Sequence, residues 1–133
     1  MIVGIGIDII EIRRIKAAVH RWGDRFLRRV FTTREIEYCG RKQRPAPHFA
    51  ARFAAKEAAM KCLGTGMRGI SFRDIEVKND PAGRPELHID KDLGAVLKSG
   101  FKNPRFHLSI THSDYYAAAV VVFDADVPVR DSE

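Results

Sequence analysis

The chain opens on the segment Ile2-Val3-Gly4-Ile5-Gly6-Ile7-Asp8-Ile9-Ile10, in which apolar residues alternate with small or acidic ones. In a strand, the odd-numbered residues 3–9 fall on one face, while Gly4, Gly6 and Asp8 fall on the other. One face is therefore apolar, and the other is nearly bare around a carboxylate. The bare face allows two interpretations. The glycines leave room for a ligand or a metal beside Asp8, or they admit a neighbouring strand and Asp8 caps the next helix.

From Glu11 onward the apolar period changes to that of an amphipathic helix, which Gly23 interrupts or ends. Arginines spaced by seven predict a basic stripe on its outer face, with a fourth arginine beside it. Taken alone, this stripe is an ordinary solvated helix face. Its members are Arg14, Arg21, Arg25 and Arg28.

Later segments predict a second helix and then mostly strands. The helix is expected from Phe49 to Leu63, between a proline-containing loop at 41–47 and a stop at Gly64. Helices followed by strands predict an α+β fold rather than a parallel βαβ array. The expected strands are residues 70–77, 87–89, 106–111 and 116–123, the last two forming a hairpin.

Composition bounds the class of protein. The chain has 133 residues, 45% of them hydrophobic, which fits a single domain over residues 1–126 with a flexible tail at 127–133. The net charge of +6 favours an anionic partner such as nucleic acid, phosphates or an acidic protein. The N-terminal segment is typical of neither a signal peptide nor a membrane span, so we expect a cytoplasmic chain without membrane contact. Two distant cysteines give no support to a disulfide framework or a zinc site.

Charged residues interrupt the apolar stripe of the second helix. Lys56 lies between Phe53 and Met60, so its charge needs a partner or must reach water along the side-chain stem. Glu57 and Lys61 are four residues apart, which is the spacing of a plain surface ion pair. The sequence lacks the motifs of Walker loops, dinucleotide-binding loops and serine hydrolases, which disfavours nucleophile-based hydrolysis and dinucleotide redox chemistry.

Two further segments have the residue types that contact phosphate. Gly64-Thr65-Gly66 can present backbone N–H groups to a phosphate, although a glycine after a helix is commonly only a C-cap. His112 stands between two strands, beside the hydroxyls of neighbouring residues. An imidazole there binds phosphate or accepts a proton near neutral pH, or is simply solvated.

Three motifs in series resemble those of the holo-acyl-carrier-protein synthases in order, spacing and length. They are Gly4-Ile5-Gly6-Ile7-Asp8-Ile9, then Arg52-Phe53-Ala54-Ala55-Lys56-Glu57-Ala58 with Lys61 and Gly64-Thr65-Gly66, and finally Leu108-Ser109-Ile110-Thr111-His112-Ser113 before Tyr116-Ala117-Ala118-Ala119. The resemblance covers about residues 1–123. It implies the 4'-phosphopantetheinyl transferase fold, a mainly antiparallel sheet packed against a long helix, in a homotrimer with active sites at subunit interfaces.

The resemblance also implies an activity and a set of site residues. The enzyme would move the 4'-phosphopantetheine group of coenzyme A to a serine of an acidic acyl-carrier protein, with Mg²⁺, and release adenosine 3',5'-bisphosphate. Asp8 and Glu57 would hold the metal. Lys56 and Lys61 would lie near the phosphates, with Lys61 at the leaving diphosphate, and the basic stripe would dock the carrier. The other implied coenzyme A contacts are Arg52, Gly64, Thr65, Gly66 and His112.

Elementary chemistry agrees with these implied roles. Two carboxylates, diphosphate oxygens and water suit Mg²⁺, which is a hard cation. Because the nucleophile is a hydroxyl of the partner, the chain needs no nucleophile of its own. Glu57, acting directly or through a metal-bound water, is the first choice for the general base. Two alternatives stay open: a basic nucleic-acid-binding module, and a magnesium-dependent nucleotide phosphohydrolase.

Overall fold

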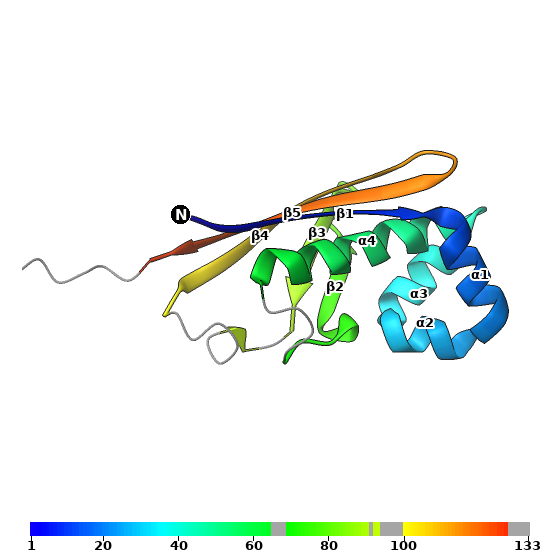
Figure 1. Cartoon of the computed structure of the whole chain (residues 1–133), viewed down its shortest axis with the longest axis horizontal. Coiled ribbons are helices and arrows are strands. Elements are labelled where there is room, and N and C mark those ends of the chain that lie inside the picture. The colour runs from blue at the N-terminus through cyan, green and yellow to red at the C-terminus, as the bar shows by residue number, and fades with distance from the viewer. Residues whose placement is uncertain (65–68, 91, 94–99, 128–133) are drawn as a thin grey trace, which may run out of the picture.

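A computed structural model describes residues 1–64, 69–90, 92–93 and 100–127 of the chain. Its helical elements are α1 (Ile12–Trp22), α2 (Asp24–Val30), α3 (Thr33–Gly40), α4 (Pro45–Leu63) and the 3-10 helix η1 (Phe72–Asp74), and its strands are β1 (Ile2–Glu11), β2 (Ile75–Asn79), β3 (Pro85–Ile89), β4 (Lys102–His112) and β5 (Tyr116–Asp126). A three-stranded sheet, ordered β1-β5-β4, lies along α4, and α1 to α3 gather at one end of it (Figure 1). A second, two-stranded sheet consists of the antiparallel strands β2 and β3. The fold is α+β, as the sequence predicted.

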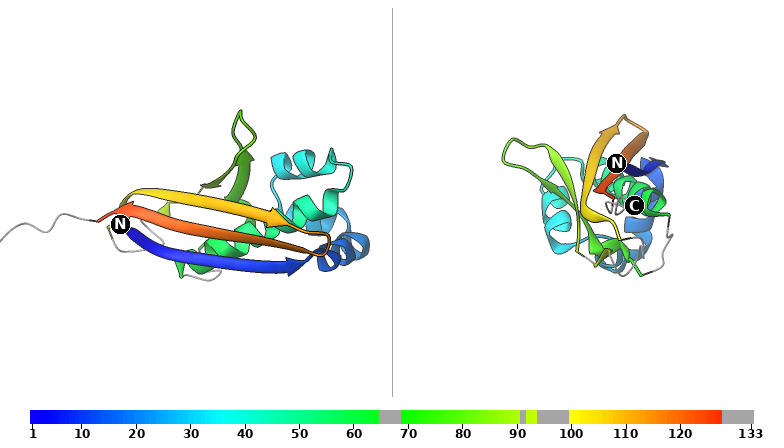
Figure 2. Two further views of the ribbon diagram at one scale, coloured as in Figure 1. Left: turned by 90° about the horizontal axis from the view of Figure 1, so that it is seen from above. Right: turned by 90° about the vertical axis from the view of Figure 1, so that its left-hand side faces the viewer.

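The central strand of the larger sheet is β5, the last strand in the sequence. It pairs antiparallel with β1, where Asp8 lies opposite Ala119, and antiparallel with β4, where His112 lies opposite Ala117. Figure 2 shows these three long strands side by side. The predicted hairpin of the last two strands is therefore confirmed, and it brings the first strand of the chain into the same sheet.

The two faces of this sheet have different surroundings. On one face α4 packs against β1 and β5, and side chains such as Val121 and Phe123 of β5 are fully buried. The apolar face of β1 points the other way. Ile5, Ile7 and Ile9 are 64%, 67% and 65% exposed, which is far above the exposure of a core residue. The helix therefore covers the glycine face of β1 and leaves its isoleucine face bare.

The glycines of β1 make room for the backbone of α4. A Cβ atom added at Gly6 would lie 1.9 Å from the carbonyl oxygen of Ala58, and one added at Gly4 would lie 2.1 Å from that of Cys62. Both distances are far inside van der Waals contact, so only glycine fits at either position. The neighbour at the glycines is therefore a helix and not the strand that one interpretation expected, while a metal or ligand beside Asp8 stays a prediction. Asp8 also does not cap α1, whose N-cap is Glu11 without a side-chain hydrogen bond.

The first helical region is divided into three helices. Gly23, with a φ of 57°, ends α1 and begins α2, so the expected interruption is confirmed. Helix α3 was missed by the sequence analysis. Thr32 accepts a hydrogen bond from the backbone N–H of Glu35, and the Glu35 carboxylate accepts one from the backbone N–H of Thr32. This capping box has a recognisable Thr-x-x-Glu signature, which could have revealed the helix.

Two predicted boundaries differ from the structure. Helix α4 begins at Pro45, because proline is well tolerated in the first turn of a helix, so the loop before it is shorter than the expected 41–47. The strand expected at 70–77 is instead the 3-10 helix η1 followed by β2, which begins at Ile75. Gly64 closes α4 in the left-handed conformation, as expected. No helix within the described residues combines the length and the apolar character that crossing a membrane requires.

Candidate active site

Asp8 lies on the covered face of β1, beside the C-terminal half of α4. Its carboxylate accepts a hydrogen bond and forms an ion pair with the ammonium of Lys61 at 3.1 Å. The same ammonium donates to the carbonyl oxygen of Ile7, also at 3.1 Å. Lys61 thus pairs with a residue on another element, whereas the sequence spacing predicted a pair with Glu57 along the helix. The contact brings two of the predicted site residues together across 53 positions of sequence.

Glu57 lies close enough to Asp8 for their charges to interact. Burial raises the pKa of the Glu57 carboxyl above its usual value, and the negative charge of Asp8 raises it further, while Lys61 opposes both effects. Two carboxylates and one ammonium therefore converge where β1 meets α4. The remaining repulsion between the two acids makes the site favourable for a cation.

Lys56 occupies a different environment, although it precedes Glu57 directly. Its side chain is fully buried, and its ammonium lies 2.7 Å from the Glu35 carboxylate, which is also buried. It also donates to the carbonyl oxygens of Phe72, at 2.9 Å, and of Ile75. Lys56 therefore has the buried partner that the sequence required, and its ammonium is covered within this chain. Its implied contact with phosphate stays a prediction.

The Lys56–Glu35 pair connects three segments. The other Glu35 oxygen accepts the backbone N–H of Val77 at 2.9 Å, so the carboxylate joins α3 to β2 while Lys56 joins α4 to both. Burial lowers the pKa of Lys56, and the charge and hydrogen bond of Glu35 raise it back. The Lys56 ammonium and both Glu35 oxygens have hydrogen-bond partners, which is the condition under which buried charges are tolerated. Glu35 is a residue that the sequence analysis missed.

Arg52 and His112 meet at the other end of α4. The Arg52 guanidinium is buried, donates to the carbonyl oxygen of His48 at 3.3 Å and to the side-chain oxygen of Asn79 at 3.2 Å, and lies over the Tyr38 ring. The His112 ring lies 5.5 Å from that of His48. These two predicted coenzyme A contacts are therefore neighbours of His48, another residue that sequence reasoning missed.

The remaining predicted residues are placed as follows. Gly64 ends α4, while Thr65 and Gly66, and the tail residues 128–133, lie outside the described residues. All four arginines of the basic stripe are exposed. The turn at Gly23 divides them, however, so Arg14 and Arg21 belong to α1 and the other two, Arg25 and Arg28, to α2. The stripe is thus two patches on consecutive helices rather than one line on a single helix.

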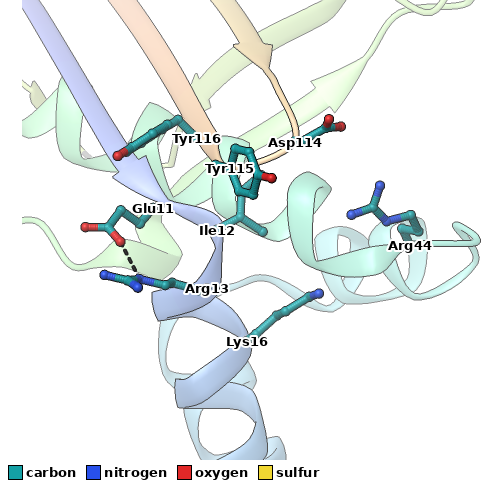
Figure 3. Close-up of a pocket in the computed structure, with 8 residues that line it drawn as sticks. All are labelled: Glu11, Ile12, Arg13, Lys16, Arg44, Asp114, Tyr115 and Tyr116. Carbon is teal, nitrogen blue, oxygen red and sulfur yellow. Dashed lines mark ion pairs between the residues drawn. The ribbon is translucent and has the colours of Figure 1, made fainter.

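A cleft of about 700 Å³ lies where β1 passes into α1. Figure 3 shows Lys16 and Arg44 extending into it from α1 and from the residue before α4, with Tyr115 of the β4–β5 turn on the opposite wall. Glu11 and Arg13 form an ion pair at its rim. Its volume is in the range of small-molecule sites, and its lining combines aromatic rings with cations. Sequence reasoning did not find it, because its residues come from three separate segments.

The fold and the site define a class of protein. The model of the 4'-phosphopantetheinyl transferase superfamily matches residues 4–121, and the chain therefore belongs to that superfamily. Within it, the chain is one of the family of holo-[acyl-carrier-protein] synthases. A relative of that name from Koribacter versatilis is 48% identical over 125 residues, which are 93% of this chain and 99% of that protein. Another from Halothermothrix orenii is 50% identical over 123 residues, covering 92% and 97%.

Solved structures agree with this assignment. The holo-[acyl-carrier-protein] synthase of Neisseria meningitidis matches with a TM-score of 0.82 and 36% identity, over 93% of this chain and 99% of that one. The synthase of Bacillus anthracis, solved in complex with CoA (3',5'-ADP), matches with a TM-score of 0.77 and 40% identity, over 95% and 99%. The synthase of Helicobacter pylori, solved in complex with coenzyme A, matches with a TM-score of 0.78 and 34% identity, over 90% and 99%.

Proposed function

We propose that this chain transfers the 4'-phosphopantetheine group of coenzyme A to a serine hydroxyl of an apo-acyl-carrier protein and releases adenosine 3',5'-bisphosphate. The observation that carries the proposal is the convergence of Asp8, Glu57 and Lys61 at the contact of β1 with α4, in a chain of this family. Relatives solved with coenzyme A support the choice of donor. We place the reaction in the cytoplasm, in the supply of carrier protein for fatty-acid synthesis.

Asp8 and Glu57 fit a magnesium ion. Both offer carboxylate oxygens, which are the donors that Mg²⁺ prefers. Burial raises the pKa of Glu57, and repulsion by Asp8 raises it further, an effect that a cation would relieve. A bound Mg²⁺ would neutralise charge that develops on the diphosphate as the P–O bond breaks. Among the described residues, no group of three or more His, Cys, Asp or Glu side chains is arranged to hold a metal ion. The pair would therefore share the ion with substrate oxygens and water.

The chain's own residues would position the substrates and move one proton. The carrier serine oxygen forms a bond to the phosphorus of the pantetheine phosphate, and the bond from that phosphorus to the bridging oxygen of the diphosphate breaks. Lys61 is exposed enough to turn from Asp8 towards the leaving phosphate, whose charge its ammonium would stabilise. Glu57 would accept the serine proton, since a carboxylate with a raised pKa is a better base near neutral pH.

Other predicted contacts extend this site. We propose that Arg52, His112 and the turn of Gly64, Thr65 and Gly66 contact coenzyme A. The two arginine patches on α1 and α2 are proposed to dock the acidic carrier. An arginine of the first patch, Arg21, also lies over the exposed Trp22 ring at 4.8 Å, so that surface combines charge with apolar area.

The bare face of β1 supports a homotrimer with active sites at subunit interfaces. Ile5, Ile7 and Ile9 form a contiguous row of exposed apolar side chains, and exposed apolar patches of this kind mark protein interfaces. Asp8 alternates with these residues and so lies on the opposite face of the same edge strand, and a second copy seated on the row would cover β1 from the other side. We propose that this copy completes the coenzyme A site.

The alternatives are less well supported. A basic nucleic-acid-binding module accounts for the net charge of +6 but not for two acids meeting beside a lysine. A magnesium-dependent phosphohydrolase of nucleotides accounts for the acids but not for the family of transferases to which the chain belongs.

Intact-mass spectrometry of an apo-acyl-carrier protein tests the proposal. The carrier is incubated with the full chain, coenzyme A and Mg²⁺, and we expect its mass to rise by one phosphopantetheine. The Asp8→Ala variant should slow the modification at least ~100-fold, since metal-ion stabilisation is worth several kcal/mol. Omission of Mg²⁺ should have a similar effect. An unmodified carrier under these conditions, or release of nucleotide product without any carrier, would contradict the transferase assignment.

A further inference from the structure

Cationic side chains gather around the start of α4. We call Lys42, His48, Arg52 and His112 the cation cluster. The Lys42 ammonium and the Arg52 guanidinium lie 4.6 Å and 4.3 Å from the centre of the Tyr38 ring, and the His48 ring lies 6.4 Å from that ring and 5.5 Å from His112. Its members come from the loop before α4, from α4 itself and from the end of β4, and the Tyr38 ring beside them belongs to α3.

The hydrogen bonds of Arg52 leave part of its guanidinium unused. Its two terminal nitrogens donate to neutral oxygens, those of the His48 backbone and the Asn79 side chain. Its Nε has no hydrogen-bond partner in the described part of the chain, although Arg52 is only 3% exposed. A buried donor without a partner is costly, and an anion bound at the cluster would satisfy or offset it.

His48 is the titratable group that this environment affects most. Burial lowers its pKa below the usual value, and electrostatic interaction with Arg52, His112 and Lys42 lowers it further. These three groups and the Tyr38 ring face His48 from the elements packed against it. In the free protein the imidazole is therefore neutral at neutral pH.

We propose that His48 couples the binding of a phosphomonoester at the cation cluster to the uptake of one proton. The inference rests on the proposed function, because coenzyme A carries a 3'-phosphomonoester in addition to its diphosphate. His48 lies nine positions before Glu57, roughly 13 Å along a helix. The cluster is thus separate from the acids to which the diphosphate is assigned, and it fits the second anionic group of the same ligand.

The direction of the coupling follows from the charges. A phosphomonoester is mostly a dianion at neutral pH, so its binding favours the charged imidazolium and raises the pKa of His48. At pH values between the lower free-state pKa and the higher bound-state pKa, the complex holds one proton more than its components. Affinity then falls as the pH rises through the bound-state pKa, by at most about tenfold per pH unit.

Calorimetric titration with a matched pair of ligands tests the coupling. Coenzyme A and dephospho-coenzyme A, which lacks only the 3'-phosphate, are titrated into the full chain with Mg²⁺, in two buffers that differ in ionisation enthalpy. The measurement is made at about pH 7.5, where the ligand phosphate, with a second pKa of about 6, exchanges few protons itself. The variant is His48→Gln, and the control is His88→Gln, an exposed histidine on β3.

We expect coenzyme A to bind with net proton uptake and dephospho-coenzyme A to bind more weakly with less uptake. His48→Gln should remove the difference in uptake between the two ligands, and His88→Gln should keep it. Binding of coenzyme A with equal proton exchange in wild type and His48→Gln would overturn the coupling while leaving the proposed function intact. Failure of both ligands to bind would overturn the two proposals together.

Discussion

The two faces of β1 carry similar numbers of residues but have different surroundings. On the inward face, Gly4 and Gly6 let the strand backbone touch the backbone of α4, and Asp8 follows at the edge of that contact. On the outward face, three isoleucines remain about two-thirds exposed. The strand therefore buries its smallest residues and exposes its most apolar ones.

The two faces therefore serve different interactions. Glycine on the inward face allows a close helix approach, which brings Glu57 and Lys61 of α4 to Asp8 of β1. Isoleucine on the outward face gains nothing from the chain's own core, so its apolar area is available to another copy. The site thus depends on the inward face directly and, in our proposal, on the outward face through assembly.

Breaking the inward contact should have the largest effect. Gly6→Val places a side chain where the Ala58 carbonyl oxygen lies 1.9 Å from the Cβ position, so α4 must separate from β1. We expect a loss of more than ~4 kcal/mol in the free energy of unfolding, at the extreme of single substitutions. Denaturant unfolding followed by circular dichroism measures it. Gly40→Ala is the control, because nothing lies within 4 Å of its added Cβ. Equal stability of both variants would show that the contact is loose.

Removing the buried partner of α4 should have the next largest effect. Lys56→Met leaves the Glu35 carboxylate buried without its cation, which should cost about 3–5 kcal/mol in unfolding free energy. Adding Glu35→Gln should restore part of the loss, since it removes the uncompensated charge. Lys61→Met, on the exposed side of the helix, should lose transfer activity with little change in stability. The reverse pattern for the two lysines would contradict their assignment.

Changing the outward face should alter assembly more than stability. Ile7 is 67% exposed, so Ile7→Ser should change the unfolding free energy of the chain by only about 0.5 kcal/mol. Its effect should appear as dissociation of the proposed trimer in light scattering coupled to size exclusion. Trp22→Ser, which removes an exposed apolar side chain on α1, should keep the oligomer. A wild-type chain that runs as a monomer would refute the assembly.

The smallest effect is expected at a surface that neither face of β1 touches. Arg14→Glu with Arg21→Glu reverses charges on α1 and should raise the apparent KM for carrier protein several-fold, because steering of the acidic partner is lost. Coenzyme A binding should stay unchanged. Arg84→Glu, on the turn between β2 and β3, is the control for the change in net charge. Equal loss for both substrates would count against docking at α1.

Much of the local structure could be predicted because its signals are local. Alternation marked β1, the turn residues marked the hairpin of β4 and β5, and Gly23 and Gly64 marked helix ends. Helix α3 had a local signal that was overlooked. The 3-10 helix η1 had one as well, the Ser71-x-x-Asp74 capping box, and a tertiary hydrogen bond from Lys56 to the Phe72 carbonyl adds to it.

The candidate site residues also divide into those that local motifs could identify and those that depend on tertiary contacts. The motifs identified Asp8, Glu57 and Lys61, and the structure brings these three together. The motifs could not distinguish Lys56 from Lys61, because both are lysines on one helix. Their environments differ through distant segments: Glu35 of α3 binds Lys56, whereas Asp8 of β1 binds Lys61.

By itself, the sequence determined the α+β class, the order of the main elements and the residue types available for a cation and a diphosphate. These properties depend on periodicity and on short motifs, which act within a few residues. Only the tertiary structure decided that the glycines of β1 receive α4, that Lys56 is buried, and that His48 lies among cations. Such outcomes depend on which distant segments pack together, and a pair contact across dozens of residues leaves no signal in either segment alone.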